Sequence, residues 1–460
     1  MKPYLPATAS FAVSGEGALN VGSDFSTCRL EETPYRRASR VDPKFRRDGY
    51  ESAFDATTLW FDAVWHDGCV TLVCPRLNNL AALFKRGKVM LDAEEAKPNV
   101  RTFYRHSTVS LKCPLPPVRI SLDIDGFRLE TPVRIATPER FRGRNTIVTM
   151  SKDNDLRWIE DFAGFHARTQ GAESILFIDN GSTTYTVSEI QGVLEHAGLD
   201  ALVLRTELPF GPRGFKPYSN SELYLQTCAL NAVRLRYLQE ARAVLFCDID
   251  ELVLSRGAET VFDAAARAPF GYTRFSGTWR YAVEERDTSL VRHADHVFRK
   301  PGETSCPHKW CVRPGGPVGQ AQWRPHTLEG FPFNWMFDSK DFTFHHCRQI
   351  TTGWKRNTAL SEELHLVEDV SAADLAGRRR QDVIHPRASD APLRRLLGRA
   401  VETASRYFFG LSVVRQLATA AFMLCCFSIV LEEALDNDPP GREIAALLAT
   451  VQRVSEIDPF

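Results

Sequence analysis

The sequence predicts an α/β protein with three folded parts: a doubly wound, mostly parallel sheet in the middle, a small antiparallel β domain before it and a helical region after it. From residue 145 to about 255, strand-like and helix-like segments alternate. Residues 59–129 contain shorter segments with alternating hydrophobicity, separated by turn residues. The last hundred residues have a helical pattern. We therefore expect a loosely ordered lead-in over 1–50, the β domain over 51–140, the α/β domain over 141–360 and the helical region over 361–460.

The composition is that of a folded protein with no dominant charge. The 460 residues include 57 Lys and Arg and 57 Asp and Glu, so no global field attracts nucleic acid. Eleven cysteines, an odd number, predict reduced thiols, and residues 1–23 lack a secretory pattern, so we expect a cytoplasmic protein. The sequence does not indicate the oligomeric state.

One apolar run bears on membrane attachment. Leu417 to Leu431 is shorter than the roughly 20 residues of a membrane span, so it predicts a buried or interfacial helix. Arginines at 378–380, 387, 394, 395 and 399 leave peripheral attachment to the inner face of a membrane open, although such a run is more often a solvated face.

The β domain is predicted from short alternating segments between turn residues. The turns are His66-Asp67-Gly68 and Asp125-Gly126. The expected strands are Leu59–Trp65, Val70–Cys74, Val89–Leu91, Thr108–Lys112 and Val118–Leu129. Binding sugar, packing on the next domain and mediating assembly all remain open roles for this part.

The α/β domain is predicted from strands that each lead into a helix. A capping box at Thr186–Glu189 begins the second helix, and Gly198 ends it. The expected strands are Thr146–Met150, Ser174–Ile178, Ala201–Leu204 and Val244–Cys247, and the other helices are Asp153–Arg168 and Asn220–Leu238.

Two carboxylates, Asp248 and Asp250, stand in the apolar run Val244–Leu254. Acids at the carboxyl end of a parallel strand lie where α/β sheets bind ligands. Two carboxylates one residue apart can both reach a hard divalent cation that in turn holds a diphosphate. The ordinary alternative is that they cap a turn. An Asp-x-Asp after a hydrophobic strand also begins the haloacid-dehalogenase phosphatases, in which the first Asp is the nucleophile.

Several motifs occur in an order that resembles a known family. They are Val148 to Asn154 with Trp158 to His166, then Ile178-Asp179-Asn180-Gly181-Ser182, then Asp248-Ile249-Asp250-Glu251, and more faintly Lys309 to Pro314, His326 and Phe344 to Arg348. Together they resemble the GT-A glycosyltransferases, in particular family 92, formerly a domain of unknown function, and related family-2-like enzymes. The resemblance covers residues 146–355. Lys152-Asp153-Asn154 replaces the family's Lys-Asn-Glu, and Cys347 replaces its usual Tyr.

The resemblance implies roles for individual residues. Asp248, Asp250 and His326 would hold Mn²⁺ or Mg²⁺. Asp338 would be the general base, with Glu329 and Asp341 as alternatives. Contacts to the nucleotide sugar would come from Thr149, Lys152, Asp179, Asn180, Lys216 and Asp248.

The function implied is a metal-dependent and inverting transfer of a hexose from a nucleotide sugar to a glycan or lipid-linked acceptor. Two alternatives remain: a phosphatase of the haloacid-dehalogenase type, and a non-catalytic glycan-binding or assembly protein with a decayed GT-A domain. The sequence does not identify the sugar, the acceptor or the linkage.

Overall fold

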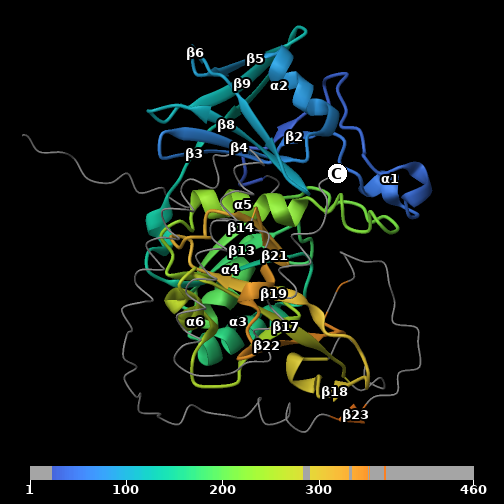
Figure 1. The fold of residues 1–460 in the computed structure, drawn as a ribbon, viewed down its shortest axis with the longest axis vertical. Coiled ribbons are helices and arrows are strands. Elements are labelled where there is room, and N and C mark those ends of the chain that lie inside the picture. Colours follow the sequence, from blue (N-terminus) through green and yellow to red (C-terminus); the bar gives the residue numbers. More distant parts are fainter. Residues whose placement is uncertain (1–22, 283–290, 331–333, 351, 353–366, 369–460) are drawn as a thin grey trace, which may run out of the picture. The chain divides into compact units, whose positions relative to one another are not determined.

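The computed structural model describes residues 23–282, 291–330, 334–350, 352 and 367–368 (Figure 1). The chain separates into two compact units, residues 1–389 and 390–460, and every described residue belongs to the first. The helical region expected over 361–460, with the run Leu417–Leu431 and the arginines at 378–399, lies outside the described residues except for the strand β23 (Val367–Glu368), which pairs with β18 (Phe298–Arg299).

The segment before the α/β domain folds into two sheets over a shared core, which includes Trp60, Leu72, Val109 and Leu122. One sheet has the order β11 (Arg134–Ile135), β3 (Asp62–His66), β4 (Cys69–Pro75), β8 (His106–Lys112), β7 (Asn99–Thr102). The other has the order β10 (Phe127–Pro132), β9 (Arg119–Ile124), β5 (Lys88–Leu91), β6 (Glu94–Glu95). A further pair, β1 (Cys28–Arg29) and β2 (Thr58–Trp60), and two short helices, α1 (Tyr50–Ala53) and α2 (Leu83–Arg86), complete this part.

Both predicted hairpin turns are confirmed. Asp67 and Gly68 have φ values of 50° and 75°, and Asp125 and Gly126 have φ values of 48° and 83°. Two successive positive φ values are the mark of the type I′ turn, whose twist matches that of the strands it joins. The turns connect β3 to β4 and β9 to β10.

The α/β domain is built on one eight-stranded sheet, which confirms the α/β class. Its order is β14 (Asp200–Arg205), β13 (Ser174–Asp179), β12 (Asn145–Ser151), β15 (Ala243–Phe246), β19 (Cys306–Val312), β17 (Tyr272–Arg280), β22 (Phe342–Cys347), β16 (Glu251–Ser255). The first four strands, all predicted, are mutually parallel. In the other half only β17 and β22 are parallel neighbours. The sheet therefore has a parallel half and a mixed half, which meet between β15 and β19.

Three helices pack on this sheet: α3 (Leu156–Gln170), α4 (Val187–His196) and α6 (Val261–Arg267). A fourth, α5 (Leu225–Arg236), packs against β20 (Gln322–Arg324) and against β3 and β4 of the β domain. The predicted capping box is confirmed, because the Thr186 hydroxyl accepts from the Glu189 amide and the Glu189 carboxylate accepts from the Thr186 amide. Helix α5 begins five residues later than predicted. The preceding residues make contacts elsewhere: Glu222 binds Arg40, and the Tyr224 hydroxyl binds Asp55.

Shorter elements complete the described part. A hairpin of β20 (Gln322–Arg324) and β21 (Thr327–Glu329) packs with α5 and β19. The 3₁₀ turns are Pro43–Phe45, Asn78–Ala82, Pro138–Phe141, His293–Asp295 and Asn334–Phe337.

Several sets of contacts join the β domain to the α/β domain within the first unit, among them the hydrogen bonds of Tyr104 with Glu329 and of His106 with Gln322. Helix α5 packs against β3 and β4 (Figure 1). The described part of the expected lead-in supplies another set: Arg205 donates its amide to Asp24, and Arg40 reaches the Ser221 carbonyl. Residues 23–50 thus form an arm between the two domains.

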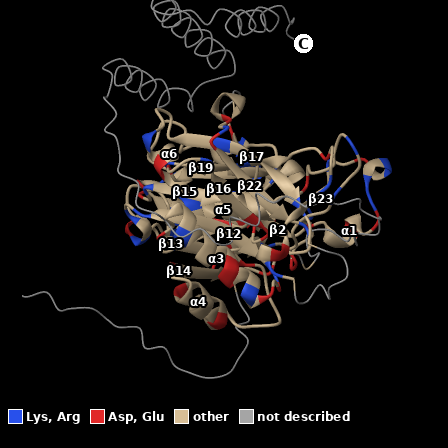
Figure 2. Cartoon of the chain, turned by 90° about the horizontal axis from the view of Figure 1, so that it is seen from below, with Lys and Arg blue, Asp and Glu red and all other residues tan. Residues whose placement is uncertain are grey.

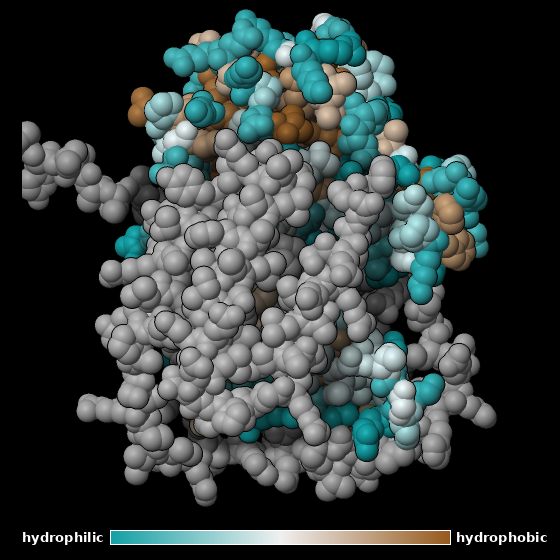
Figure 3. Space-filling view, viewed as in Figure 1, coloured by the Kyte–Doolittle hydropathy of each residue, from teal (hydrophilic) through white to brown (hydrophobic). Residues whose placement is uncertain are grey.

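Charged residues of both signs occur throughout the described part. Figure 2 shows Lys and Arg interspersed with Asp and Glu along the chain, and the full sequence has 57 of each sign. Figure 3 shows hydrophobic groups among hydrophilic ones over the β domain, where Leu115 and Val118 are 78% and 68% exposed. Within the ranges that the structure describes, none of the helices combines the length and the apolar character needed to cross a bilayer.

Candidate functional site

The apolar run Val244–Leu254 is two strands that lie far apart in the sheet. Strand β15 occupies the fourth place and β16 the eighth, and only Cys247–Asp250 connect them. Four strand spacings amount to roughly 19 Å in a flat sheet. Five residue steps reach roughly 17 Å even when fully extended. The sheet must therefore curl, and this brings Asp248 and Asp250 to the place where its two halves meet.

The backbone of this connection is held from three directions. The Cys347 amide donates to the Asp250 carbonyl at 2.7 Å, and the Asp248 amide donates to the Glu251 carboxylate at 2.8 Å. His293 Nε2 donates to the Ile249 carbonyl at 2.8 Å, while its Nδ1 lies 3.6 Å from Asp161 of α3. The connection is thus held by one neighbouring residue, Glu251, and by two that are distant in the sequence, His293 and Cys347.

Lys309 of β19 lies fully buried beneath the connection. Its ammonium is 2.5 Å from Asp248 Oδ2 and 2.8 Å from Glu251 Oε2. Burial by itself lowers the pKa of Lys309, but the charges of Asp248 and Glu251 outweigh burial and raise the pKa above its usual value. Lys309 therefore stays charged and neutralises part of the acidic cluster.

Asp250, Glu251 and His346 form a group suited to a divalent cation. Asp250 Oδ2 lies 3.0 Å from His346 Nε2, and Glu251 Oε1 lies 3.3 Å from His346 Nδ1. One donor atom from each of the three lies within 4.8 Å of the others. Two donors bound at right angles, each at roughly 2.1 Å from one ion, are about 3 Å apart, so Asp250 and His346 fit a shared ion.

The surroundings of His346 keep it in place. Glu251 and Trp279 are its direct neighbours on the adjacent strands, and the Trp279 ring centroid is 4.2 Å from the imidazole. Burial lowers the pKa of His346, but Asp250 and then Glu251 outweigh it and raise the pKa. Burial raises the pKa of Glu251, against the opposing charge of Lys309.

Two of the predicted metal ligands have other partners. Asp248 binds Lys309 through Oδ2 and accepts from Gln226 through Oδ1 at 3.0 Å. His326 donates from Nδ1 to the carbonyl of His308, the residue before Lys309, at 3.0 Å. Among the described residues, the three-residue group contains Asp250 but neither Asp248 nor His326.

Sequence reasoning did not assign His346 or Lys309 to the site. The only signal was their place in the segments Phe344–Arg348 and Lys309–Pro314, which resemble family motifs. Nothing local in either segment indicates that its charged residue meets the aspartates.

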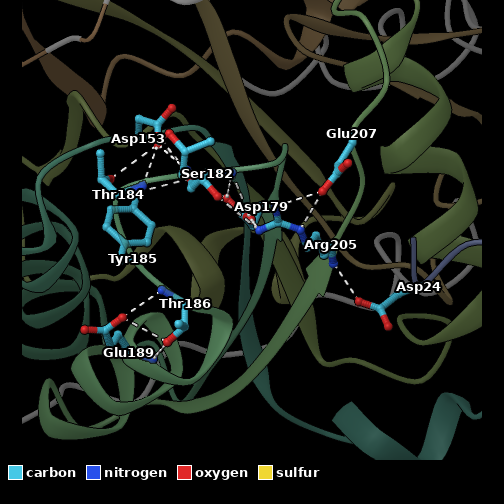
Figure 4. Close-up of polar contacts among 11 residues, drawn as sticks. Asp24, Asp153, Asp179, Ser182, Thr184, Tyr185, Thr186, Glu189, Arg205 and Glu207 are labelled. Carbon is cyan, nitrogen blue, oxygen red and sulfur yellow. Dashed lines mark hydrogen bonds and ion pairs between the residues drawn. The ribbon is translucent and has the colours of Figure 1, made fainter. Parts of the chain in front are cut away.

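Asp179 ends β13, and its carboxylate is used within its own turn (Figure 4). It accepts from the amide and the hydroxyl of Ser182, and Arg205 Nη1 donates to it at 2.8 Å. Burial raises the pKa of Asp179, while Ser182 and Arg205 oppose that shift. Asp153 braces the same turn, because its carboxylate accepts from the Thr183 amide at 2.6 Å.

The other residues predicted to bind nucleotide lie on neighbouring strand ends or on a loop. Thr149 of β12 and Asn180 after β13 are buried, and Oγ1 of Thr149 and Oδ1 of Asn180 lack a hydrogen-bond partner in the described part of the chain. Lys152 is half-buried. Lys216 is exposed and precedes a cis peptide bond to Pro217.

The three candidate bases lie in different settings. Both carboxylate oxygens of Asp338 bind Arg274, and Oδ2 is also 3.4 Å from His308 Nε2. Glu329 accepts from the Tyr104 amide at 2.6 Å. Asp341 is exposed, and its amide donates to the Ser339 hydroxyl.

Comparisons with known proteins return structures but no sequence relatives. A scan against protein-family models finds no match. A search of curated proteins also finds none. The solved structures include S. aureus TarS, at 17% identity over 31% of this chain and 23% of that chain, with a TM-score of 0.21. Another is the galactosyltransferase LgtC in complex with donor and acceptor sugar analogues, at 14% identity over 37% of this chain and 58% of LgtC, with a TM-score of 0.21.

A third is the bifunctional glycosyltransferase WbbM, at 12% identity over 32% of this chain and 25% of WbbM, with a TM-score of 0.20. The matched part thus spans about a quarter of TarS and of WbbM. TM-scores of about 0.2 are too low to assign a fold or a function, and none is assigned from them.

Proposed function

We propose that the protein is a metal-dependent glycosyltransferase with a GT-A type domain, which transfers a hexose from a nucleotide sugar to a glycan or lipid-linked acceptor with inversion. The observation that carries the proposal is the group Asp250, Glu251 and His346, which lies between β15 and the mixed half of the sheet. This is the edge at which open α/β sheets bind ligands.

Asp250 and His346 would hold the ion in this proposal. Their oxygen and nitrogen donors fit Mn²⁺ better than Mg²⁺, because Mg²⁺ strongly prefers oxygen ligands. The bound ion would stabilise negative charge on the departing diphosphate. Glu251 would hold the His346 ring in orientation, since a carboxylate behind a ligating imidazole fixes its tautomer.

Asp248 takes a different part from the one first predicted for it. Its carboxylate is engaged by Lys309 and Gln226, so we propose that it positions Lys309 and contacts the nucleotide sugar instead of acting as the main metal ligand. Lys309 would keep the paired acids from repelling the incoming diphosphate.

The remaining nucleotide contacts are also proposals. The unpartnered oxygens of Thr149 and Asn180 support a place for them near the ligand. Asp179 would act through the shape of its turn, because its carboxylate is already engaged. Lys152 and the exposed Lys216 would contribute positive charge. Asp338 remains the proposed base; it would have to leave Arg274 to accept a proton.

The first experiment is binding and turnover by the full chain. Purified protein with Mn²⁺ and a panel of nucleotide sugars should release the nucleoside diphosphate, and Asp250→Asn should lower this release at least ~10³-fold. Asp123→Asn is the matched control, because Asp123 pairs with Arg128 on the β domain surface. Protein that binds no nucleotide with or without metal would exclude this function.

The same preparation separates the two alternatives. A haloacid-dehalogenase phosphatase would release phosphate from a simple phosphomonoester, and Asp248→Asn would abolish that release. A non-catalytic glycan-binding protein would bind glycan in the presence of Mn²⁺ and donor without consuming the donor.

A further inference from the structure

Arg105, the residue before β8 in the β domain, is a buried cation with no hydrogen-bond or ion-pair partner among the described residues. The residue is 7% exposed, and its Nε has no hydrogen-bond partner. Its closest aromatic contact is the Tyr104 ring, with the guanidinium carbon 5.9 Å from the centroid. No described residue forms a hydrogen bond or an ion pair with it, and the charge of Glu329 acts on its pKa without direct contact. A buried charge is normally paired, so this arginine indicates a missing anion.

The groups around Arg105 add positive charge. Arg324 of β20 lies over the Tyr104 ring, with its guanidinium carbon 4.7 Å from the centroid. Burial first, and then the charges of Arg324 and Arg213, lower the pKa of Arg105 to about 10. The nearby acid, Glu329, already accepts from the Tyr104 amide, and its other oxygen is 3.9 Å from Arg324.

The loop that carries Arg105 is held rigidly. Arg76 donates to the Phe103 carbonyl and Arg40 donates to the Tyr104 carbonyl, both at 2.7 Å. His106 on the other side is hydrogen-bonded to Gln322 at 3.0 Å. Two arginines thus hold the backbone of the loop, whereas Arg105 has no hydrogen-bond partner among the described residues.

The loop adjoins the candidate site through the β20–β21 hairpin. The Tyr104 amide donates to Glu329 of β21, and His106 bonds Gln322 of β20. His326, between the two strands of the hairpin, bonds the carbonyl of His308, the residue before Lys309 of the site. The hairpin thus contacts the loop of Arg105 at its strands and the site strand β19 at its turn.

We propose that Arg105, together with Arg324, binds a phosphate group of the ligand that occupies the candidate site. A guanidinium matches phosphate oxygens with two parallel hydrogen bonds, and a second cation beside it adds charge. The phosphate is either part of the donor diphosphate or a group on the acceptor. This choice rests on the proposed function, whereas the phosphate site itself does not.

The test measures, by calorimetry, the binding of inorganic pyrophosphate to the full chain in the absence of metal. Arg105→Gln should weaken pyrophosphate binding at least ~10-fold, and Arg105→Lys should weaken it less. Arg128→Gln, on the exposed β9–β10 hairpin, is the matched control and should leave the affinity unchanged. Arg105→Gln should also unfold at the same temperature as the unchanged chain or higher, because it removes an unpaired buried charge. If Arg105 only stabilised the fold, Arg105→Gln would unfold at a lower temperature than the unchanged chain.

Two further titrations identify the source of the phosphate. Weaker binding of uridine diphosphate with Mn²⁺ in Arg105→Gln assigns the site to the donor, and weaker binding of glycerol 3-phosphate alone assigns it to the acceptor. An unchanged affinity for all three probes, or no binding of any by the unchanged chain, overturns the proposal. Asp250→Asn should abolish only the Mn²⁺-dependent binding, so a failure of the glycosyltransferase proposal leaves the pyrophosphate result intact.

Discussion

The turn after β13 and the turn after β15 each place an aspartate at the carboxyl edge of the same sheet, yet the two carboxylates have different partners. Asp179 is satisfied locally by Ser182 and by Arg205 of the next strand. Asp250 meets His346, which comes from the mixed half of the sheet. A carboxylate at a strand end can therefore bind a ligand only when hydrogen bonds within its own turn do not already occupy its oxygens.

The largest effect expected from this difference is on stability at the first turn. Asp179→Asn should lower the free energy of unfolding by about 3 kcal/mol, because it breaks the buried ion pair with Arg205 and leaves that arginine only the more exposed carboxylate of Glu207. Asp250→Asn should change stability by less than ~1 kcal/mol. Urea denaturation of both variants measures the contrast, and equal losses would remove the distinction between the two turns.

The free energy of unfolding should depend on pH through His166 of α3, which bonds β16, the strand that follows the second turn. His166 donates from Nδ1 to the Phe162 carbonyl and accepts the Val253 amide of β16 at Nε2. Burial first, and then the charge of His293, lower its pKa to about 4. The histidine is therefore neutral when folded and takes up a proton on unfolding below pH 6.5.

Its contribution is fully present above pH 6.5 and is lost as the pH falls towards 4. A shift from 6.5 to about 4 corresponds to about 3 kcal/mol. Unfolding free energies measured from pH 7 to 4.5 should fall less steeply in His166→Gln than in the unchanged chain. Parallel curves would contradict this assignment.

A smaller effect separates the two histidines that have been considered as metal ligands. His346→Gln should weaken Mn²⁺ binding roughly 10- to 100-fold, whereas His326→Gln should change it less than ~3-fold. The difference follows from geometry, since His346 Nε2 lies 3.0 Å from Asp250 and His326 bonds the His308 carbonyl. Manganese titration by calorimetry decides between them, and a stronger effect of His326→Gln would restore the ligand set first predicted.

The smallest effect concerns the helix that follows the Asp179 turn. Thr186→Ala removes a hydroxyl that caps α4 and should cost about 1 kcal/mol. Thr186→Ser keeps the hydroxyl and is the control. Nucleotide binding by Thr186→Ala should be unchanged in calorimetry, because the capping box stabilises the helix and not the ligand site.

The sequence predicts elements whose signals are local. The strands Asn145–Ser151 and Ser174–Asp179 are apolar runs, and the capping box and both glycine turns are set by neighbouring residues. The partners of the two aspartates are not predictable in this way. Lys309 and His346 reach the site because β19 and β22 pair where they do, and that pairing depends on packing across the whole sheet.

The same limit explains two of the departures from the predicted fold. The run Val244–Leu254 has uniform hydrophobicity, so nothing in it marks the point where the chain leaves β15 for the far edge of the sheet. The start of α5 is displaced by Arg40 and Asp55, which lie well over a hundred residues earlier. Short-range patterns carry no information about either.

The position of β16 at the far edge of the sheet has a consequence for how the protein matures. The parallel strands come from one stretch of chain, residues 145–246, and their contacts close early in a growing polypeptide. The cluster of Asp250, Glu251 and His346 closes only after residue 346 has been synthesised and β22 has paired with β16. If the cluster binds the proposed ion, metal affinity would therefore be acquired last, and a chain that ends before β22 would not bind the ion.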